Sequence, residues 1–292
     1  MKIGIVGQGF VGSAIREGLK QYHQVQTYDI NPSISMCDSL VELVDESQII
    51  FVCLPTPMRK DGSCDTDLVR SCVHEVNACA PRFATPRPKI VVVKSTVPPG
   101  TTHDLDSECS NIDVVFSPEF LTEANSFEDF KNQAHIIVGG PRPATATVKT
   151  MFRKAFPSIP IIKTSSQHAE MVKYFINCFL ATKVSFSNEV YQACTKLNID
   201  YDKVVEYATY DRRLGTSHFS VPGPDSHFGF GGHCFPKDLN ALVYLMRDLG
   251  VAPTVLSAVR DKNDEVREHR DWEEMKGRAV SGDFTKELQN EY

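Results

Sequence analysis

The first half of the chain alternates short apolar runs, mostly of β-branched residues, with longer stretches of helical periodicity. Apolar side chains occupy both faces of the short runs, which is typical of strands buried in a parallel sheet between layers of helices. This alternation predicts an α/β domain with a doubly wound parallel sheet. The expected strands are Lys2–Val6, Val25–Asp29, Ile49–Cys53, Ile90–Lys94, Val114–Phe116, Ile136–Val138 and Ile159–Lys163.

The pattern changes near Thr164. From Gln167 to about Leu197, apolar residues recur at spacings of three and four without Gly or Pro, which predicts one long helix. Further helices are expected over Tyr201–Tyr207, Leu239–Leu249 and Pro253–Val266. We therefore expect a first domain over 1–165, a mainly α-helical central domain over 166–268 and a charged tail over 269–292.

The end of the chain is rich in charge. Eleven of the sixteen residues from Asp261 to Lys276 are charged, and few apolar residues interrupt them. This composition predicts a solvated helix that frays toward Tyr292.

Composition narrows the class of protein. The 292 residues are 41% hydrophobic and 23% charged, as in ordinary globular proteins. The net charge of -6 and the absence of a basic stripe argue against nucleic-acid binding, and no apolar run reaches the roughly 20 residues of a membrane span. The nine cysteines form no CxxC pair, so we expect neither a disulfide framework nor a metal site, and a reducing, cytoplasmic location.

A glycine-rich turn follows the first strand and opens a helix: Gly7-Gln8-Gly9-Phe10-Val11-Gly12. The first glycine forms the turn, the second admits a pyrophosphate, and the third lets the helix pack closely on the strand. Asp29 ends the second strand, where its carboxylate can accept a ribose 2′-hydroxyl and would repel a 2′-phosphate. The pattern predicts a Rossmann-like NAD site formed by Gly7, Gly9, Phe10, Val11, Gly12 and Asp29, with Thr56 and Thr96 after later strands.

Four further segments carry groups suited to catalysis. Lys94–Thr101 leaves a strand into a Pro-Pro-Gly turn, and Ser117–Glu123 sets Glu119 and Glu123 four residues apart. Lys173 and Asn177 lie one helical turn apart. Phe228–Asp238 places Cys234 between a glycine run and Lys237-Asp238. Each segment alone has a structural interpretation as a turn, a cap or a buried side chain, but their joint occurrence behind a dinucleotide pattern favours an active site.

These motifs resemble the UDP-glucose and GDP-mannose 6-dehydrogenases, a family of NAD-dependent nucleotide-sugar dehydrogenases. The resemblance runs from the N-terminus to about residue 265, and Gly-Phe-Gly-Gly-His-Cys-Phe-Pro-Lys-Asp is its most specific part. The matching stretches are Ile3–Gly12, Lys94–Thr101, Ser117–Glu123, Ala169–Glu189 and Gly229–Asp238.

The resemblance implies a four-electron oxidation of a sugar C6 hydroxyl, from UDP-glucose to UDP-glucuronate, through a thiohemiacetal and a thioester on Cys234. Lys173 and Asn177 would stabilise charge on the C6 oxygen, Asp238 and Thr96 would hold water or the alcohol, and Glu119 would assist thioester hydrolysis. Further residues expected at the substrate are Glu123, Arg213, Lys237, Phe228 and Gly231. A homodimer and a nucleotide-sugar substrate are the expected partners.

The chain also departs from the family pattern. Glu123-Ala124 stands where Glu-Gly is usual, and Gln133-Ala134-His135 where Pro-Asp-Arg is usual. A histidine such as His233 is familiar in dehydrogenases of N-acetylated UDP-sugars, whereas Lys237-Asp238 favours the glucose type. Family members usually continue into a C-terminal nucleotide-binding domain, so we expect a short form or a fragment.

Several alternatives stay open at this point. The substrate could be GDP-mannose or an N-acetylated UDP-hexosamine. The chain could also be a catalytically silent NAD-binding homologue, or a hydroxy acid dehydrogenase that does not need Cys234.

Overall fold

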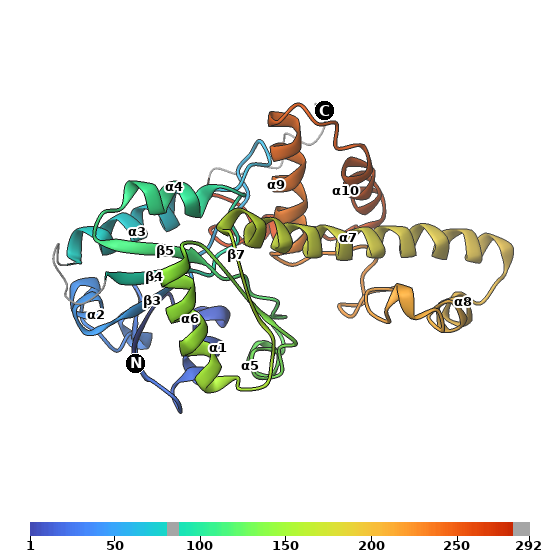
Figure 1. Ribbon diagram of the computed structural model, residues 1–292. Helices are drawn as coiled ribbons and strands as arrows, with labels where there is room; N and C mark the ends of the chain where they lie inside the picture. The colour runs from blue at the N-terminus through green and yellow to red at the C-terminus, as the bar shows by residue number, and fades with distance from the viewer. Residues whose placement is uncertain (81–87, 283–292) are drawn as a thin grey trace. The chain divides into compact units, whose positions relative to one another are not determined.

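The computed structural model describes residues 1–80 and 88–282 (Figure 1). The chain divides into unit 1, Met1–Thr56 with Thr66–Lys173, and unit 2, Pro57–Asp65 with Tyr174–Tyr292. The boundary between these two units falls inside the long helix α7 (Ser166–Leu197).

Unit 1 contains a seven-stranded sheet in the order β2-β1-β3-β4-β5-β6-β7. Every strand expected from the sequence is present, with its ends within two residues of the expected ones. The strands are β1 (Lys2–Val6), β2 (Gln24–Tyr28), β3 (Ile49–Val52), β4 (Lys89–Val93), β5 (Ile112–Phe116), β6 (Ile136–Gly139) and β7 (Ile161–Thr164).

The sheet is mostly parallel, as predicted, but its last two strands run the other way. β1 to β5 are mutually parallel, β6 pairs antiparallel with β5 at Phe116 and Gly139, and β7 is parallel to β6. A parallel connection needs a crossover, usually a helix on one face of the sheet. The connection from β5 to β6 contains only the six-residue helix α5 (Ser126–Lys131), which packs on α1 (Phe10–Leu19).

Helices cover both faces of this sheet, which makes the fold Rossmann-like (Figure 1). α2 (Leu40–Glu46), α3 (Asp67–Cys79) and α4 (Thr101–Glu108) cover one face, and α1 and α6 (Arg142–Ala155) cover the other. Alternate residues of each strand point to opposite faces of the sheet. Because helices cover both faces, every residue of a central strand such as β3 is buried. A short 3₁₀ helix, Pro32–Ile34, follows β2.

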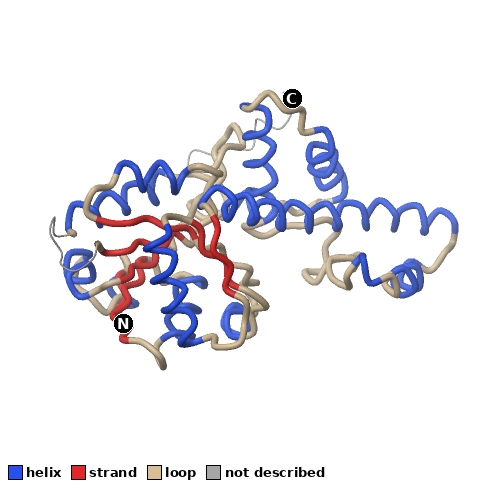
Figure 2. The backbone as a smooth tube through the Cα atoms, viewed as in Figure 1, coloured by secondary structure: helices blue, strands red, loops and turns tan. Residues whose placement is uncertain are grey.

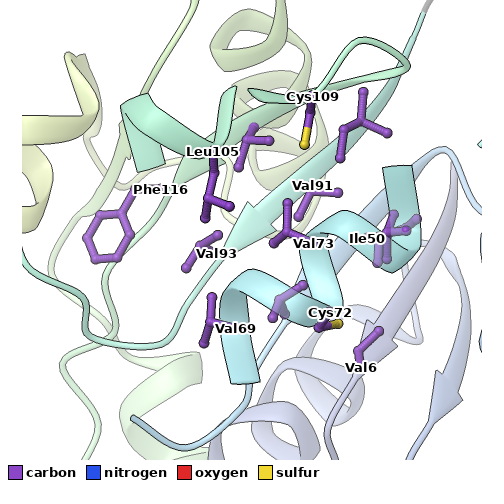
Figure 3. Packing of buried hydrophobic residues seen from close by; sticks show 14 of the residues in the cluster. Val6, Ile50, Val69, Cys72, Val73, Val91, Val93, Leu105, Cys109 and Phe116 are labelled. Carbon is purple, nitrogen blue, oxygen red and sulfur yellow. The ribbon is translucent and has the colours of Figure 1, made fainter. Parts of the chain in front are cut away.

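The apolar core on the first of these faces consists mainly of aliphatic side chains from strands and helices, together with Phe116 and buried cysteines. Figure 3 shows it at close range, with residues of α3 and α4 packed on β4. Each fully buried aliphatic side chain contributes roughly 1.5–3 kcal/mol. The residues in this contact include Val69, Val73, Val91, Val93 and Leu105.

Unit 2 is built from helices joined by loops, as Figure 2 shows. Its helices are α7 from Tyr174 onward, α8 (Tyr201–Ala208), α9 (Phe235–Asp248) and α10 (Thr254–Val266), with 3₁₀ turns at Arg212–Leu214 and Asp271–Glu274. α9 begins four residues before the expected Leu239, because Pro236 is compatible with a first helical turn. No helix among the described residues is both long enough and apolar enough to cross a bilayer.

The prediction of a solvated helical tail is wrong for the described residues. α10 ends at Val266, and the next residue, Arg267, is buried. Trp272 is also buried, in a cluster with Met58, Ala279 and Val280. The charges of this segment pair with one another, and the backbone of Met58 pairs with Ala279 and Ser281, which explains why Pro57–Asp65 joins unit 2. Residues 283–292 of the predicted tail lie outside the described residues.

Candidate functional site

The glycine turn of unit 1 has the geometry that a dinucleotide requires. Gly7 has φ +89°, and a Cβ there would lie 2.5 Å from the carbonyl oxygen of Cys53. A Cβ on Gly12 would lie 1.9 Å from the carbonyl oxygen of Gly7. At Gly9 no neighbouring atom lies within 4 Å of the Cβ position, and α1 begins at the next residue, Phe10. The open space at Gly9, next to Phe10 and Val11 at the helix N-terminus, suits a pyrophosphate.

Asp29 connects this turn to the end of β2. Its Oδ2 accepts a hydrogen bond from the Gln8 backbone at 2.7 Å, and its Oδ1 accepts one from Asn31 at 2.9 Å. A carboxylate oxygen has a second lone pair, so Asp29 can still accept a ribose hydroxyl. Among the described residues, the buried Oε1 of Gln8 has no hydrogen-bond partner. The residues of this turn thus fit NAD.

Thr56 and Thr96 meet at the carboxyl edge of β3 and β4. Thr56 Oγ1 donates to the carbonyl of Thr96 at 2.8 Å. Beside them, Ser95 Oγ donates to the Leu54 carbonyl at 2.6 Å and accepts from its backbone N–H at 3.0 Å. These bonds fix the two loops at the edge where parallel sheets bind ligands.

Glu119 forms a buried ion pair with Lys173 in unit 1. Lys173 Nζ donates to Glu119 Oε1 at 2.9 Å and to its backbone carbonyl at 2.7 Å, and Glu119 Oε2 accepts from the Leu121 backbone at 2.7 Å. Burial alone would raise the pKa of Glu119, but the Lys173 ammonium and the Leu121 amide together hold it below its usual value. Glu119 is therefore an ionised acceptor.

Glu170, a residue not predicted from the sequence, lies on α7 close to Lys173. Its carboxylate is fully buried and accepts from the backbones of Gly100 at 2.7 Å and Thr102 at 2.9 Å, at the start of α4. Burial raises the pKa of Glu170, although these hydrogen bonds oppose the rise. The only sequence signal is an acidic residue within an apolar helical pattern.

Unit 2 contains a second buried polar group around Asp238. Asn177 Nδ2 donates to Asp238 Oδ2 at 2.6 Å, Lys237 pairs with Oδ1, and Cys178 Sγ donates to the Asp238 carbonyl at 3.7 Å. Burial alone would lower the pKa of Lys237, but the Asp238 carboxylate raises it above its usual value. The structure thus brings Asn177, Lys237 and Asp238 together.

Cys234 lies at the N-cap of α9, and its carbonyl accepts from the Asp238 backbone at 3.0 Å. Two asparagines that sequence reasoning missed hold the glycine run before it. Asn188 accepts from Gly229 at 3.1 Å, and Asn263 both accepts from the Phe230 backbone at 2.7 Å and donates to its carbonyl at 3.1 Å. An asparagine has no periodic signal that would have identified these contacts.

The expected substrate residues differ in their surroundings. Arg213 keeps 88% of its side chain exposed and pairs with Asp211, and Glu123 is exposed whereas Glu119 is buried. Phe228 is exposed and packs on Tyr191, with ring centroids 5.7 Å apart.

Gly231 is tightly packed, because a Cβ there would lie 2.2 Å from both Arg267 Nη2 and Asp271 Oδ1. Within residues 1–80 and 88–282, no three His, Cys, Asp or Glu side chains gather as they would around a metal ion.

Both units match domains of known proteins. Residues 33–156 match the NAD binding domain of the UDP-glucose/GDP-mannose dehydrogenase family, and residues 167–265 match its central domain. The chain is 30% identical to UDP-glucose 6-dehydrogenase TuaD of Bacillus subtilis, over 82% of this chain and 51% of that protein. It is also 30% identical to UDP-glucose 6-dehydrogenase AglM of Haloferax volcanii, over 90% of this chain and 70% of that protein.

A solved structure agrees with these matches. A UDP-glucose dehydrogenase from the archaeon Pyrobaculum islandicum superposes with a TM-score of 0.81 at 30% identity, covering 90% of this chain and 68% of that one. The chain spans about half the length of the first of these relatives and about two thirds of the other two.

Proposed function

Because the chain belongs to the UDP-glucose/GDP-mannose dehydrogenase family, we propose that it oxidises the C6 hydroxyl of a nucleotide sugar to a carboxylate, with UDP-glucose as the favoured substrate. Relatives named UDP-glucose 6-dehydrogenase and the solved structure of a UDP-glucose dehydrogenase support this choice. The observation that carries the proposal is Cys234 at the N-terminus of α9, one turn from the buried Lys237–Asp238 pair.

The thiol of Cys234 is the proposed nucleophile. When bound, NAD supplies the acceptor for the hydride that leaves C6 in each of the two oxidations. Between them Cys234 Sγ bonds to the aldehyde carbon, and the carbonyl oxygen takes a proton to give a thiohemiacetal. After the second oxidation water adds to the thioester, the S–C bond breaks, and the thiol regains its proton as the carboxylate leaves. The N-terminus of a helix favours the thiolate that the attack requires.

The polar side chains have complementary roles. We assign Lys173 and Asn177 to negative charge on the C6 oxygen, since an ammonium and an amide N–H are donors. Asp238 and Thr96 orient the alcohol or water, and Glu119, kept ionised by Lys173, accepts the proton of the hydrolytic water. Arg213, Glu123, Lys237, Phe228 and Gly231 remain the proposed substrate residues.

The test is turnover with a panel of nucleotide sugars. We expect two NADH per UDP-glucose from the wild type, loss of complete turnover in Cys234→Ser, and full turnover in Cys79→Ser, a change at a partly exposed cysteine of α3. Two NADH per sugar at the normal rate from Cys234→Ser would contradict the mechanism. A preference for GDP-mannose or an N-acetylated UDP-hexosamine would change the substrate. Binding of NAD without oxidation of any sugar would indicate a silent homologue.

We also propose that α7 forms a homodimer contact. Phe175, Phe179 and Phe186 are 68%, 56% and 62% exposed, and the rings of the first two stack with centroids 6.3 Å apart. Burying such side chains against a second copy would contribute roughly 1.5–3 kcal/mol each.

Sedimentation should therefore show a dimer for the wild type that Phe179→Asp dissociates. Leu249→Asp, at an exposed apolar site just after α9, is the control and should stay dimeric. A monomeric wild type would refute the contact. We further propose a reducing compartment such as the cytoplasm, since the nine cysteines of the sequence include no CxxC pair.

A further inference from the structure

The carboxyl end of β4 carries a buried ammonium group that the proposed reaction does not use. Lys94 directly follows the strand and is 5% exposed. Its Nζ donates to the carbonyl of Pro118 at 2.9 Å, and that carbonyl belongs to the peptide group that precedes Glu119. A lysine this deeply buried requires compensating contacts, because burial strongly disfavours its charged form.

The segment Pro118–Glu119 is held by two ammonium groups from different elements. Lys94 comes from the end of β4 and binds the Pro118 carbonyl, whereas Lys173 comes from α7 and binds both the carbonyl and the carboxylate of Glu119. All three charged side chains are at least nine-tenths buried. Two cations therefore act on one carboxylate, whose charge they favour over its protonated form.

We propose that Lys94 is a positioning residue for Glu119, which holds the Pro118–Glu119 peptide in place and, together with Lys173, keeps the Glu119 carboxylate ionised. This inference rests on the proposed role of Glu119 in thioester hydrolysis. Lys94 acts through Glu119 and does not itself exchange a proton with the substrate.

The surroundings of Lys94 shift the loss of its proton toward neutral pH. Burial lowers the pKa of Lys94 to about 8, against the opposing effects of Glu119 and Cys53 and in the same direction as Lys173. Burial also raises the pKa of Cys53 to about 12, so this thiol is neutral at pH values near 8. Above about pH 8, Lys94 would therefore lose its charge while Cys53 stays neutral, and Lys173 would be the remaining cation beside Glu119.

The first test needs no substrate and no variant. In the wild type with ¹³C-carboxyl-labelled glutamate, the NMR signal of Glu119 should show its main titration at low pH and a second, smaller step near pH 8 as Lys94 loses its proton. Absence of any second step, at whatever pH Lys94 loses its proton, would overturn the proposal. Failure of the dehydrogenase assay would not affect this measurement, so the two hypotheses are tested separately.

Variants at Lys94 provide the second test. Lys94→Met should raise the pKa of Glu119 and Lys94→Arg should leave it unchanged while removing the step near pH 8. Lys163→Met, at an exposed lysine of β7, is the control and should change neither. An unchanged Glu119 titration in Lys94→Met, or a surviving step in Lys94→Arg, would contradict the role.

Kinetics give a readout that a purely structural role would not move. The rate at which the thioester on Cys234 hydrolyses, followed by the mass of the intact protein, should fall about tenfold or more in Lys94→Met at pH 7, since general-base assistance is worth roughly 10²–10⁴-fold. The KM for NAD should stay unchanged. Equal slowing of thioester formation and hydrolysis would refute a specific effect on Glu119.

Discussion

Arg267 connects the segment before Cys234 to the end of the described chain, and replacing it provides a quantitative test of unit 2. Its guanidinium is 1% exposed and donates to Asp225 Oδ2 at 2.7 Å, Asp271 Oδ1 at 3.1 Å and the His269 carbonyl at 2.8 Å. Asp271 in turn accepts from the Gly232 backbone at 3.0 Å. Arg267→Met removes all of these bonds and leaves two carboxylates without their cation.

The structure sets the size of the effect. Removing one partner of a buried ion pair costs about 3–5 kcal/mol. The side chains of Asp225 and Asp271 keep 44% and 26% exposure, so water can solvate them after the change. We therefore expect Arg267→Met to lower the free energy of unfolding of unit 2 by about 2–3 kcal/mol, less than for a fully buried pair.

Urea unfolding followed by the fluorescence of Trp272 measures this change. Trp272 is the single tryptophan of the chain, is 3% exposed and lies in unit 2, so its signal reports this unit. The matched control is Arg213→Met, which removes a largely exposed arginine paired with Asp211 and should have little effect. A loss below about 1 kcal/mol for Arg267→Met would refute the buried ion pair as a stabilising contact.

Three further outcomes follow. Gly231→Ala should destabilise unit 2 by about 1–3 kcal/mol in the same assay, because its Cβ would lie 2.2 Å from Arg267; an unchanged midpoint contradicts this packing. Lys173 and the Leu121 amide hold the native pKa of Glu119 below its usual value. The carboxylate therefore stabilises the fold above its unfolded-state pKa, and this stabilisation is lost as pH falls through the native pKa. Acid unfolding should be less steep in Glu119→Gln than in the wild type, and equal slopes would count against this role of Glu119. Burial raises the pKa of Cys53 and Cys72 to about 12, so iodoacetamide at neutral pH should label them far more slowly than Cys234, as peptide mapping would show; equal rates refute this.

Local patterns explain which parts of the fold the sequence predicted. Buried strands are marked by runs of β-branched residues, and the first glycine turn by the three positions where a Cβ would obstruct a backbone or a ligand. The direction of β6 has no such mark, because it depends on α5 packing against α1 rather than crossing the sheet. The prediction of a solvated tail is wrong for a similar reason, since a run of charges does not show that Arg267 pairs with Asp225 and Asp271 inside the protein.

The site could be predicted only by residue type. Lys173 and Asn177 both lie on α7, as their spacing indicated. Their partners are Glu119, 54 residues before the lysine, and Asp238, 61 residues after the asparagine. Pairing over such separations depends on the packing of the helix and leaves no periodic trace in the sequence. The resemblance to the dehydrogenase family indicated these residues, and the structure shows which of them form pairs.

The bond between Asn177 and Asp238 restricts what this asparagine can do. An ionised carboxylate only accepts hydrogen bonds, so the Nδ2 end of the amide must face Asp238, as the 2.6 Å contact has it. Nδ2 carries two hydrogens, and one is given to Asp238 Oδ2. The second is the donor that the proposed role at the C6 oxygen needs. In the proposed reaction, Asp238 would therefore first fix the orientation of this amide. If Asn177 were turned the other way, its Oδ1 would face the developing negative charge and repel it.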